Sequence, residues 1–495
     1  MSTAAVERQT LRVVPTIGPA VALAGLATLL FVRLVPDVTA KPLHEDEAVA
    51  GLIATRPLGE VLQTVVLDRG GAPLHFVLAH VTLALDTSPD ALRWLSVVLA
   101  VATVPLCYDL ARRLAGTAAG LMAAALAATS QLLTVYGTFG RMYSLLAFVS
   151  ALAVDMFVRA LDRPRRNTTL VAAATAVLPL AVHPFGAFLL TAEVAVAAWL
   201  WRGRSLRAAL PVIGVMLPAL PLLSFNMRLT DRYADEPARE RDLTTFADAL
   251  GGAAGGRGVT LIVFAVLAVT GLLVVNRAFA ALAILAVGTP LVALAIVGTD
   301  RLGPRHLIFT LPLWIVVVAA GLTRIARELP QAMRFALPVA VTVAALLAPS
   351  AVPDPRTQDR TVSAPANDLR TRVSDGDVLF PYSPVFLAAL PAAARARGFP
   401  REPVALARVA ARTRTVDAVF VPLPTAESWR ILELRGPFGN GRAVLVAAAS
   451  ALQTPDPYAQ QLRGAACAAL ARLRSSCQPV ATSTDGTSPQ RSSSR

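Results

Sequence analysis

The sequence has little of the charge that a soluble protein carries, and almost no lysine. Charged residues make up 16% of the 495 residues and hydrophobic residues 55%, with a mean hydropathy of +0.58, whereas a soluble globular domain carries about 25% charge. Lys41 is the only lysine, so arginine supplies nearly all of the positive charge behind the net charge of +14. Most arginines lie in short clusters between long apolar runs. This distribution is typical of membrane topology and excludes nucleic acid as a partner.

Cysteine is also scarce, with three residues in the whole chain. Cys107, Cys467 and Cys477 are too few for a disulfide scaffold, and their spacing is not that of a zinc site. Cys467 and Cys477 fall in a part of the chain that we expect on the exterior, where a disulfide is permitted. The composition therefore indicates a polytopic membrane protein rather than a small cysteine-stabilised fold.

Eleven apolar runs are candidates for membrane-spanning helices. A spanning helix needs about 20 mostly apolar residues, because it must cross about 30 Å of hydrocarbon. Only His183 and Pro184 separate the fifth run from the sixth, and the proline lacks the amide hydrogen that a continuous helix needs. We interpret these two runs as a tight hairpin, with one long kinked helix as the alternative. The runs are 13–35, 93–111, 114–135, 142–161, 168–182, 184–201, 208–226, 258–275, 278–298, 306–323 and 335–352.

The arginine clusters favour the hairpin and set the orientation. With the N-terminus inside, the inside segments hold fourteen arginines and three acids, as the excess of arginine in cytoplasmic loops requires. A single helix over 168–201 would move alternate later clusters to the exterior. The first run is longer than the apolar core of about 7–15 residues in a signal peptide, so we expect an uncleaved anchor. The sequence thus predicts an all-α polytopic protein with about 11 transmembrane helices, its N-terminus inside and its C-terminus outside.

This topology places three segments on the exterior. The first loop contains a short apolar stretch that ends near Leu85, which we expect to form a helix along the membrane interface. The last segment holds candidate strands at 377–380, 418–421 and 443–446 and a candidate helix at 456–474, so we predict a small α/β domain. The predicted parts are a transmembrane module (1–352) with exterior loops at 36–92 and 227–257, an exterior α/β domain (353–480) and a disordered tail (481–495).

An acidic cluster, His44-Glu45-Asp46-Glu47, lies just outside the first span. Three adjacent carboxylates cannot all ionise comfortably in a cleft of low dielectric constant, so one of them can hold a raised pKa or bind a cation. The alternative is a hydrated acidic start to a loop. A metal site on His75 and His80 is improbable, because residues five apart do not share a helix face.

Two arginines occupy unusual positions at the exterior membrane edge, where Arg141 ends the third span and Arg305 begins the tenth. A charge near hydrocarbon costs a few kcal/mol unless it is paired or hydrated. A phosphate at the headgroup level would provide that pairing through two parallel hydrogen bonds; a local acid or the lipid headgroups would also do so. Asp155 and Arg159 are predicted to form a structural ion pair. Glu193, in the middle of the sixth run, stays outside the predicted site.

These features together resemble the GT-C superfamily of glycosyltransferases, in the branch of the protein O-mannosyltransferases and lipid A aminoarabinose transferases (glycosyltransferase family 39-like). The resemblance covers the membrane part to about residue 325. It is carried by the order and spacing of several short motifs: Asp46-Glu47, residues 72–76, residues 93–96, residues 136–145, His183, and residues 305–307 with Pro312.

The resemblance implies an integral membrane transferase that moves a sugar, with inversion, from a polyprenyl-phosphate carrier to a glycan, lipid or protein acceptor on the exterior face of the plasma membrane. It implies Asp46 as the catalytic base; Glu47 would orient Asp46, the acceptor or a divalent cation. Arg141 and Arg305 would bind the donor phosphate. The remaining predicted pocket residues are His44, Glu45, Arg69, His75, Tyr143, His183 and His306.

The chain departs from the family pattern at two places. Gly71-Ala72-Pro73 stands where relatives usually have Pro-Pro or His-Pro, and His306 stands where they have a tyrosine. These departures leave the acceptor open more than the reaction type.

Two other classes of function fit the same hydropathy. A transporter or lipid-carrier flippase would show internal repeats and charges deep in several spans, but the sequence offers little beyond Glu193. A membrane assembly factor would carry its function in residues 353–480.

Overall fold

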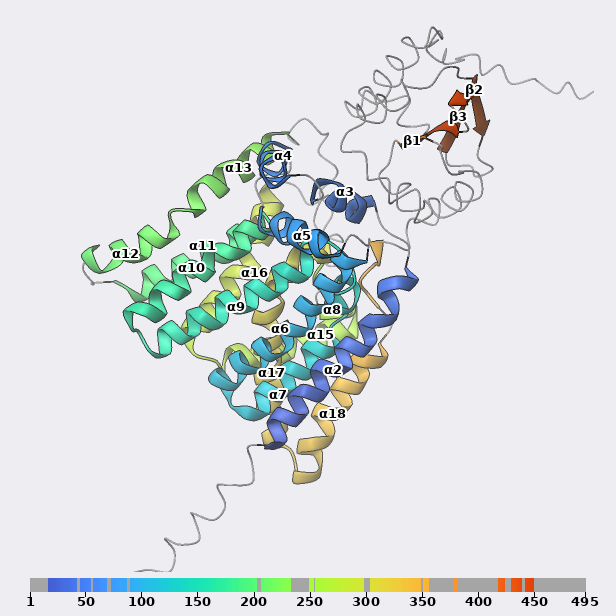
Figure 1. The fold of residues 1–495 in the computed structure, drawn as a ribbon. Helices are drawn as coiled ribbons and strands as arrows, with labels where there is room; N and C mark the ends of the chain where they lie inside the picture. Colours follow the sequence, from blue (N-terminus) through green and yellow to red (C-terminus); the bar gives the residue numbers. More distant parts are fainter. Residues whose placement is uncertain are drawn as a thin grey trace, which may run out of the picture. The chain divides into compact units, whose positions relative to one another are not determined.

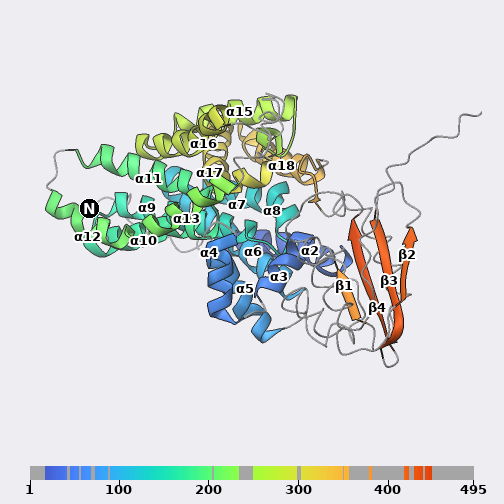
Figure 2. The same ribbon diagram turned by 90° about the horizontal axis from the view of Figure 1, so that it is seen from above.

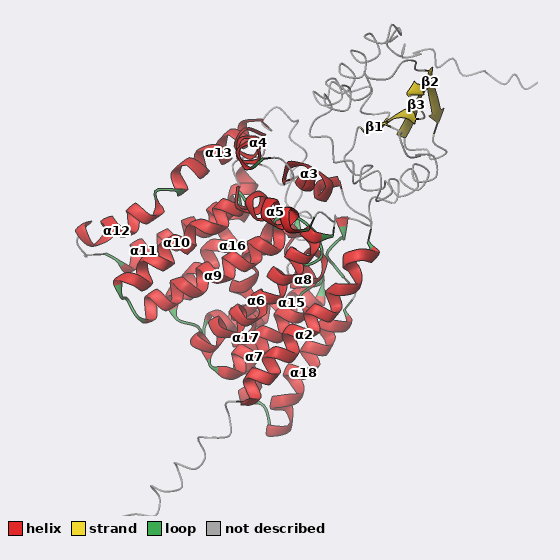
Figure 3. Ribbon diagram, in the orientation of Figure 1, coloured by secondary structure: helices red, strands yellow, loops and turns green. Residues whose placement is uncertain are grey.

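A computed structural model of the chain divides into two compact units, residues 1–358 and 359–495. The first unit is helical and holds the candidate site, and the second contains a small β-sheet (Figures 1 and 3). The structure describes residues 17–41, 45–54, 57–68, 73–86, 90–202, 206–232, 249–252, 254–297, 303–348, 350–355, 378–381, 417–422, 429–438 and 441–448.

Each of the eleven predicted apolar runs falls on helix in the first unit. Two of them are broken. Ser130 has an extended backbone and caps the next helix by accepting a hydrogen bond from Leu133 N, and Pro218 disfavours helical geometry in the residue before it. The elements are α2 (Ile17–Ala40), α3 (Glu45–Ala54), α4 (Leu58–Asp68), α5 (Pro73–Leu85), α6 (Ala91–Ala115), α7 (Thr117–Thr129), α8 (Gln131–Tyr136), α9 (Tyr143–Asp162), α10 (Arg166–Val182), α11 (Gly186–Leu200), α12 (Leu206–Met216), α13 (Ala219–Arg232), α15 (Val259–Leu272), α16 (Arg277–Val297), the 3₁₀ helix η2 (Pro304–Thr310), α17 (Leu311–Glu328) and α18 (Gln331–Leu347).

The chain is a multi-pass membrane protein. Four helices in the described residues are long and apolar enough to cross a bilayer by themselves, and the bent pair α12–α13 would make a fifth. The remaining apolar stretches within helices have 10–17 described residues. The predicted number of about 11 spans therefore stays a prediction.

Two helices extend beyond the predicted runs. Helix α2 continues through Pro36 to Ala40, five residues beyond the expected end at 35, because one proline removes only one amide donor from a helix. Helix α13 continues to Arg232, so the predicted loop at 227–257 begins inside a helix.

Helix α17 lies at the centre of the first unit and is buried along most of its length. It packs against α6, α7, α9 and α15. At the crossing with α15, a Cβ atom on Gly271 would lie 1.8 Å from Val317 O, and one on Gly321 would lie 2.0 Å from Leu267 O. Glycine is therefore required at both positions, as is common where membrane helices approach closely.

The fifth and sixth runs form the expected hairpin. Helices α10 and α11 pack against each other and are joined by residues 183–185. The turn is tight: a Cβ atom on Gly186 would lie 2.1 Å from Pro179 C.

The end of the bundle opposite α3, α4 and α5 carries a network of ion pairs. The predicted pair is present, with Arg159 Nε 2.8 Å from Asp155 Oδ2. Asp109, near the end of α6, accepts from Arg159 at 2.6 Å and from Arg113 at 2.8 Å. These contacts join the C-terminal ends of α6 and α9.

The second unit contains a four-stranded sheet in the order β1-β4-β3-β2 (Figure 2). β1 pairs with β4 in parallel, and β3 is antiparallel to both of its neighbours. β1, β2 and β4 lie on the three segments expected to be strands. β3 was not predicted, because charged residues interrupt its apolar pattern. The candidate helix at 456–474 and the tail at 481–495 lie outside the described residues. The strands are β1 (Val378–Pro381), β2 (Asp417–Pro422), β3 (Trp429–Phe438) and β4 (Gly441–Ala448).

Candidate functional site

The acidic cluster forms the first turn of α3, which lies with α4 and α5 at one end of the first unit (Figure 1). Asp46 is half-buried, whereas Glu47 is only 2% exposed. Glu45 is the first residue of α3; its side chain, together with the whole of His44 and Arg69, lies outside the described part of the chain. The two acids of the predicted catalytic pair therefore stand in different environments.

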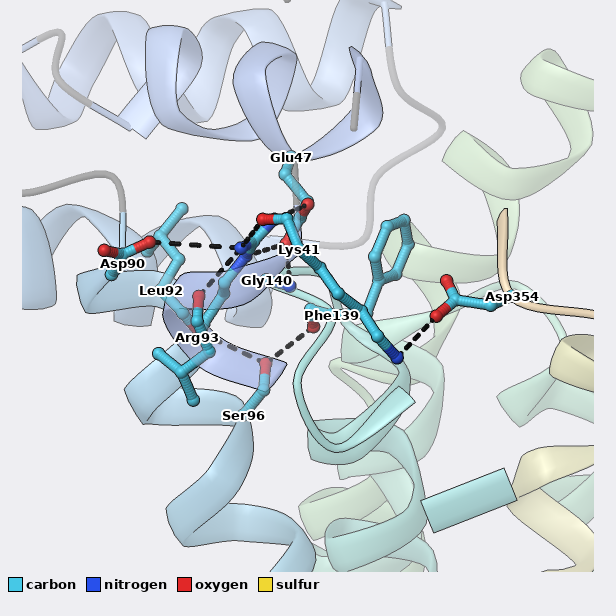
Figure 4. Close-up of polar contacts among 10 residues, drawn as sticks. Lys41, Glu47, Asp90, Leu92, Arg93, Ser96, Phe139, Gly140 and Asp354 are labelled. Atoms are coloured by element: carbon cyan, nitrogen blue, oxygen red, sulfur yellow. Dashed lines mark hydrogen bonds and ion pairs between the residues drawn. The ribbon is translucent and has the colours of Figure 1, made fainter. Parts of the chain in front are cut away.

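Glu47 forms a buried, two-pronged ion pair with Arg93, the third residue of α6 (Figure 4). Arg93 Nε donates to Glu47 Oε1 at 2.9 Å, and Arg93 Nη2 donates to Glu47 Oε2 at 2.7 Å. Gly140 N donates to the same Oε1 at 2.7 Å. A planar guanidinium matches a carboxylate in this way. One carboxylate thus joins α3, α6 and the loop between α8 and α9.

The other side of Arg93 binds the end of α2. Arg93 Nη1 donates to Val38 O and to Lys41 O, both at 2.8 Å. Carbonyls at the last turn of a helix lack partners within the helix, so Arg93 satisfies groups that would otherwise stay unpaired. The Lys41 side chain lies 2.8 Å from Asp354 (Figure 4) and 2.5 Å from Asp37.

The Tyr136–Arg141 motif is a loop that depends on its glycines. A Cβ atom on Gly140 would lie 3.1 Å from Leu92 Cβ and 3.2 Å from Glu47 Oε1, so a larger residue would press on the ion pair. Ser96 Oγ donates to Phe139 O at 2.8 Å. These contacts fix the loop that carries Arg141.

Arg141 reaches back to the acidic turn. Its Nη1 donates to the main-chain oxygen of Asp46 at 3.1 Å, whereas its Nε is buried and has no hydrogen-bond partner in the described part of the chain. The guanidinium is therefore held beside Asp46 by one nitrogen and keeps a second donor unused.

Aromatic and imidazole rings line the neighbouring wall. Tyr143 begins α9, and its ring centroid lies 6.2 Å from that of His183. The ring centroids of His183 and His306 lie 6.0 Å apart, and the His306 ring stacks on the Phe185 ring with a centroid distance of 5.0 Å. His183 Nδ1 accepts from Phe185 N at 3.1 Å, and His306 Nδ1 accepts from Gly303 N at 2.9 Å. Since an accepting nitrogen carries no hydrogen, both neutral rings hold their hydrogen on Nε2.

Charges converge on this wall. Tyr143 lies within electrostatic reach of Arg305, Arg141 and Asp46. Burial, followed by the charges of Arg141 and Arg305, lowers the pKa of His183 to about 3. Burial and the charge of Arg141 lower the pKa of His75 to about 3. Both rings are therefore neutral at physiological pH and act as hydrogen-bonding groups rather than as cations.

The structure thus brings eight of the predicted site residues to one end of the first unit. The sequence analysis assigned no role to Arg93. Like Arg141 and Arg305, however, Arg93 lies at the outer end of a predicted span, and this position is a signal in the sequence. Gly140 and Lys41 carried no comparable signal. The eight residues are Asp46, Glu47, His75, Arg141, Tyr143, His183, Arg305 and His306.

Among the described residues, no group of three or more His, Cys, Asp and Glu side chains could hold a metal ion. His44 and the side chain of Glu45, which belonged to the predicted cluster, are not among them. The oxygens of Glu47 are engaged by Arg93 and Gly140.

Fold and site together define a helical multi-pass membrane protein with a polar, arginine-containing site at one end of its bundle. Residues 71–227, which include α5 to α11, match the family described as dolichyl-phosphate-mannose-protein mannosyltransferase. The match confirms the resemblance to the GT-C glycosyltransferases over that segment. No curated protein matches the sequence.

The chain is also similar to two proteins of known structure. The Archaeoglobus fulgidus oligosaccharyltransferase in the apo form is 12% identical with a TM-score of 0.46, and the match covers 73% of this chain and 59% of that one. ArnT from Cupriavidus metallidurans bound to undecaprenyl phosphate is 13% identical with a TM-score of 0.45, and the match covers 83% of each chain. The chain thus spans about three fifths of the length of the oligosaccharyltransferase.

Proposed function

We propose that the protein is a glycosyltransferase that moves a sugar from a polyprenyl-phosphate carrier to a hydroxyl or amine of an acceptor, on the exterior face of the plasma membrane. The observation that carries this proposal is that Arg141 is bound beside Asp46, next to a wall in which Tyr143, His183 and His306 follow one another and Arg305 adjoins His306. A carboxylate suits activation of an acceptor, and guanidinium groups suit a phosphate leaving group.

In the proposed reaction, Asp46 accepts the proton of the acceptor group as its oxygen or nitrogen attacks C1 of the sugar. The bond from C1 to the phosphate oxygen breaks on the opposite side, so the anomeric centre is inverted. Arg141 and Arg305 stabilise the negative charge that develops on the departing phosphate. The sugar leaves the carrier, and the carrier retains its phosphate.

Glu47 acts in this scheme as a positioning residue. Its two oxygens hold Arg93 and Gly140 N, and these contacts fix the start of α3 against the loop that carries Arg141. Because Asp46 is adjacent to Glu47, one buried ion pair sets the distance between the base and the phosphate-binding arginine.

The exterior location is supported by the direction of three helical segments. α6, α9 and the pair η2–α17 each begin at the site and end in arginines at the opposite end of the bundle, among them Arg112, Arg159 and Arg327. Because cytoplasmic ends are enriched in arginine, the site would face outward. A lipid carrier presents its sugar on that face.

The test is sugar transfer by the purified full-length protein in lipid nanodiscs, with radiolabelled polyprenyl-phosphate sugars and a membrane extract as acceptor. Asp46→Asn should abolish transfer while the protein stays folded. Asp162→Asn, at the exposed end of α9, is the matched control and should transfer at the wild-type rate.

Two results would contradict the proposal. If Asp46→Asn transfers the sugar of a confirmed donor at the wild-type rate, Asp46 is not the base. If the wild-type protein moves labelled carrier across the bilayer and leaves the sugar attached, the protein is a flippase.

A further inference from the structure

Two buried nitrogen atoms of the site have no hydrogen-bond partner among the residues that the structure describes. They are Nε2 of His75, whose side chain is 3% exposed, and Nε of Arg141. Leaving a buried donor unpaired is unfavourable, and more so when the group is charged. Native proteins retain few such groups, and each calls for a physical reason. A ligand that is absent from the free protein is such a reason.

The two atoms belong to one region. His75 comes from α5, and Arg141 comes from the loop before α9, yet the charge of Arg141 acts directly on the imidazole of His75. Arg141 is anchored through Nη1 to the main-chain oxygen of Asp46, so its Nε stands at a fixed place beside the acidic turn. Helix α5, which carries His75, also packs against α3, and Arg141 binds the first turn of α3. Both unpaired nitrogen atoms therefore belong to side chains whose segments contact α3.

The chemistry of these atoms selects the ligand. Arg141 Nε can only donate, and Arg141 keeps its positive charge at every physiological pH. His75 is neutral, and its Nε2 can carry the ring hydrogen and donate as well. Two donors beside a permanent positive charge suit an oxyanion better than a neutral hydroxyl group. An oxygen atom of a phosphate would satisfy both at once.

We propose that His75 Nε2 and Arg141 Nε together bind the phosphate of the lipid carrier, which makes His75 a donor-binding residue of the transferase. This inference rests on the proposed function and deepens it. The neutral imidazole adds a hydrogen bond without adding a further permanent charge to those of Arg141 and Arg305, so the carrier phosphate is held during transfer and can still dissociate afterwards.

The test measures binding of undecaprenyl phosphate to the full-length protein in nanodiscs by native mass spectrometry, with undecaprenol as the neutral counterpart. His75→Phe keeps the ring volume and removes the donor, and it should weaken binding of the phosphate tenfold or more, as expected for a lost hydrogen bond to a charged group. Binding of undecaprenol should not change. The matched control is His80→Phe on the same helix, because His80 Nδ1 contacts Ala54 O instead, and it should bind like the wild type.

A second pair of variants covers the case in which His75→Phe does not fold. His75→Gln places an amide donor near the position of Nε2, whereas His75→Asn places it near Nδ1. Affinity close to that of the wild type for Gln, and about tenfold weaker for Asn, supports the inference. Equal affinities in the two variants overturn it.

Competition identifies the source of the phosphate. An excess of phosphatidylglycerol or of inorganic phosphate should not displace undecaprenyl phosphate; displacement by either would overturn the assignment to the carrier. If the wild type shows Asp46-dependent transfer and His75→Phe binds the phosphate normally, this inference fails and the proposed function stands. If the wild type neither binds the carrier nor transfers sugar, both fail.

Discussion

Arg93→Met is the substitution whose outcome depends most directly on the geometry of the site. Arg93 is 1% exposed, and its guanidinium donates to both oxygens of Glu47 and to the carbonyls of Val38 and Lys41. Removing it leaves the Glu47 carboxylate in a buried position without its counter-ion. Breaking a buried ion pair from one side costs about 3–5 kcal/mol, so we expect a loss of about 4 kcal/mol.

The double variant Arg93→Met, Glu47→Leu separates stability from function. With both charges gone, no buried charge is left uncompensated, and apolar replacements of whole ion pairs are often neutral. We therefore expect the double variant to be more stable than Arg93→Met alone. It should still fail to transfer sugar, because the contacts of Glu47 with Arg93 and Gly140 N are gone and only the hydrogen bond from Arg141 to Asp46 O still joins the Asp46 turn to the loop.

The assay is thermal unfolding in nanodiscs, followed by tryptophan fluorescence, alongside sugar transfer. The control is Arg112→Met: this arginine is 42% exposed and pairs with Asp109, and exposed pairs contribute about 0–1 kcal/mol. Our reasoning is refuted if Arg93→Met unfolds at the wild-type temperature, or if the double variant transfers sugar at the wild-type rate.

Three further outcomes are expected. Arg141→Ala should lower transfer about 100-fold or more; unchanged turnover and donor KM would contradict its role. Because burial lowers the pKa of His75 and His183 to about 3, against about 6.5 when unfolded, the unfolded chain binds more protons, and stability is lost as the pH falls below 6.5. At pH 5.5 each histidine should lower the free energy of unfolding by about 1.4 kcal/mol relative to pH 8. The fall in melting temperature between pH 8 and pH 5.5 should be smaller in a His75→Phe, His183→Phe variant than in the wild type. An equal fall in both proteins would contradict this prediction. Gly140→Ala should lower the melting temperature and slow transfer by pressing on Glu47, unlike Gly18→Ala, where a Cβ atom meets nothing within 4 Å.

The fold was predictable where a single physical signal dominates. Long apolar runs indicated helices, and the distribution of arginine favoured the hairpin at His183. The signal fails at the ends and breaks of helices. Apolarity does not reveal that α2 continues through Pro36, or that Ser130 divides one run into α7 and α8. In the second unit, charged residues concealed β3 among the candidate strands.

Site residues were predictable where a charged side chain lies at a position in the topology that disfavours it. Arg141 and Arg305 were selected because they lie at the wrong end of a span, and the same reasoning applied to Arg93 would have selected it too. The partners of Arg93 could not be inferred in this way. Two of them are main-chain carbonyls, which leave no trace in the pattern of side chains, and Glu47 lies 46 residues away.

Lys41 is a single site for chemical labelling of lysine side chains. It is the only lysine side chain in 495 residues, and its amine is held between Asp37 and Asp354 while its carbonyl accepts from Arg93. Reagents that acylate amines usually map the whole surface of a protein. Here the rate of acylation at a lysine side chain would report how often one contact separates. In that contact Lys41, at the end of α2, binds Asp354 in the segment that leads toward the second unit.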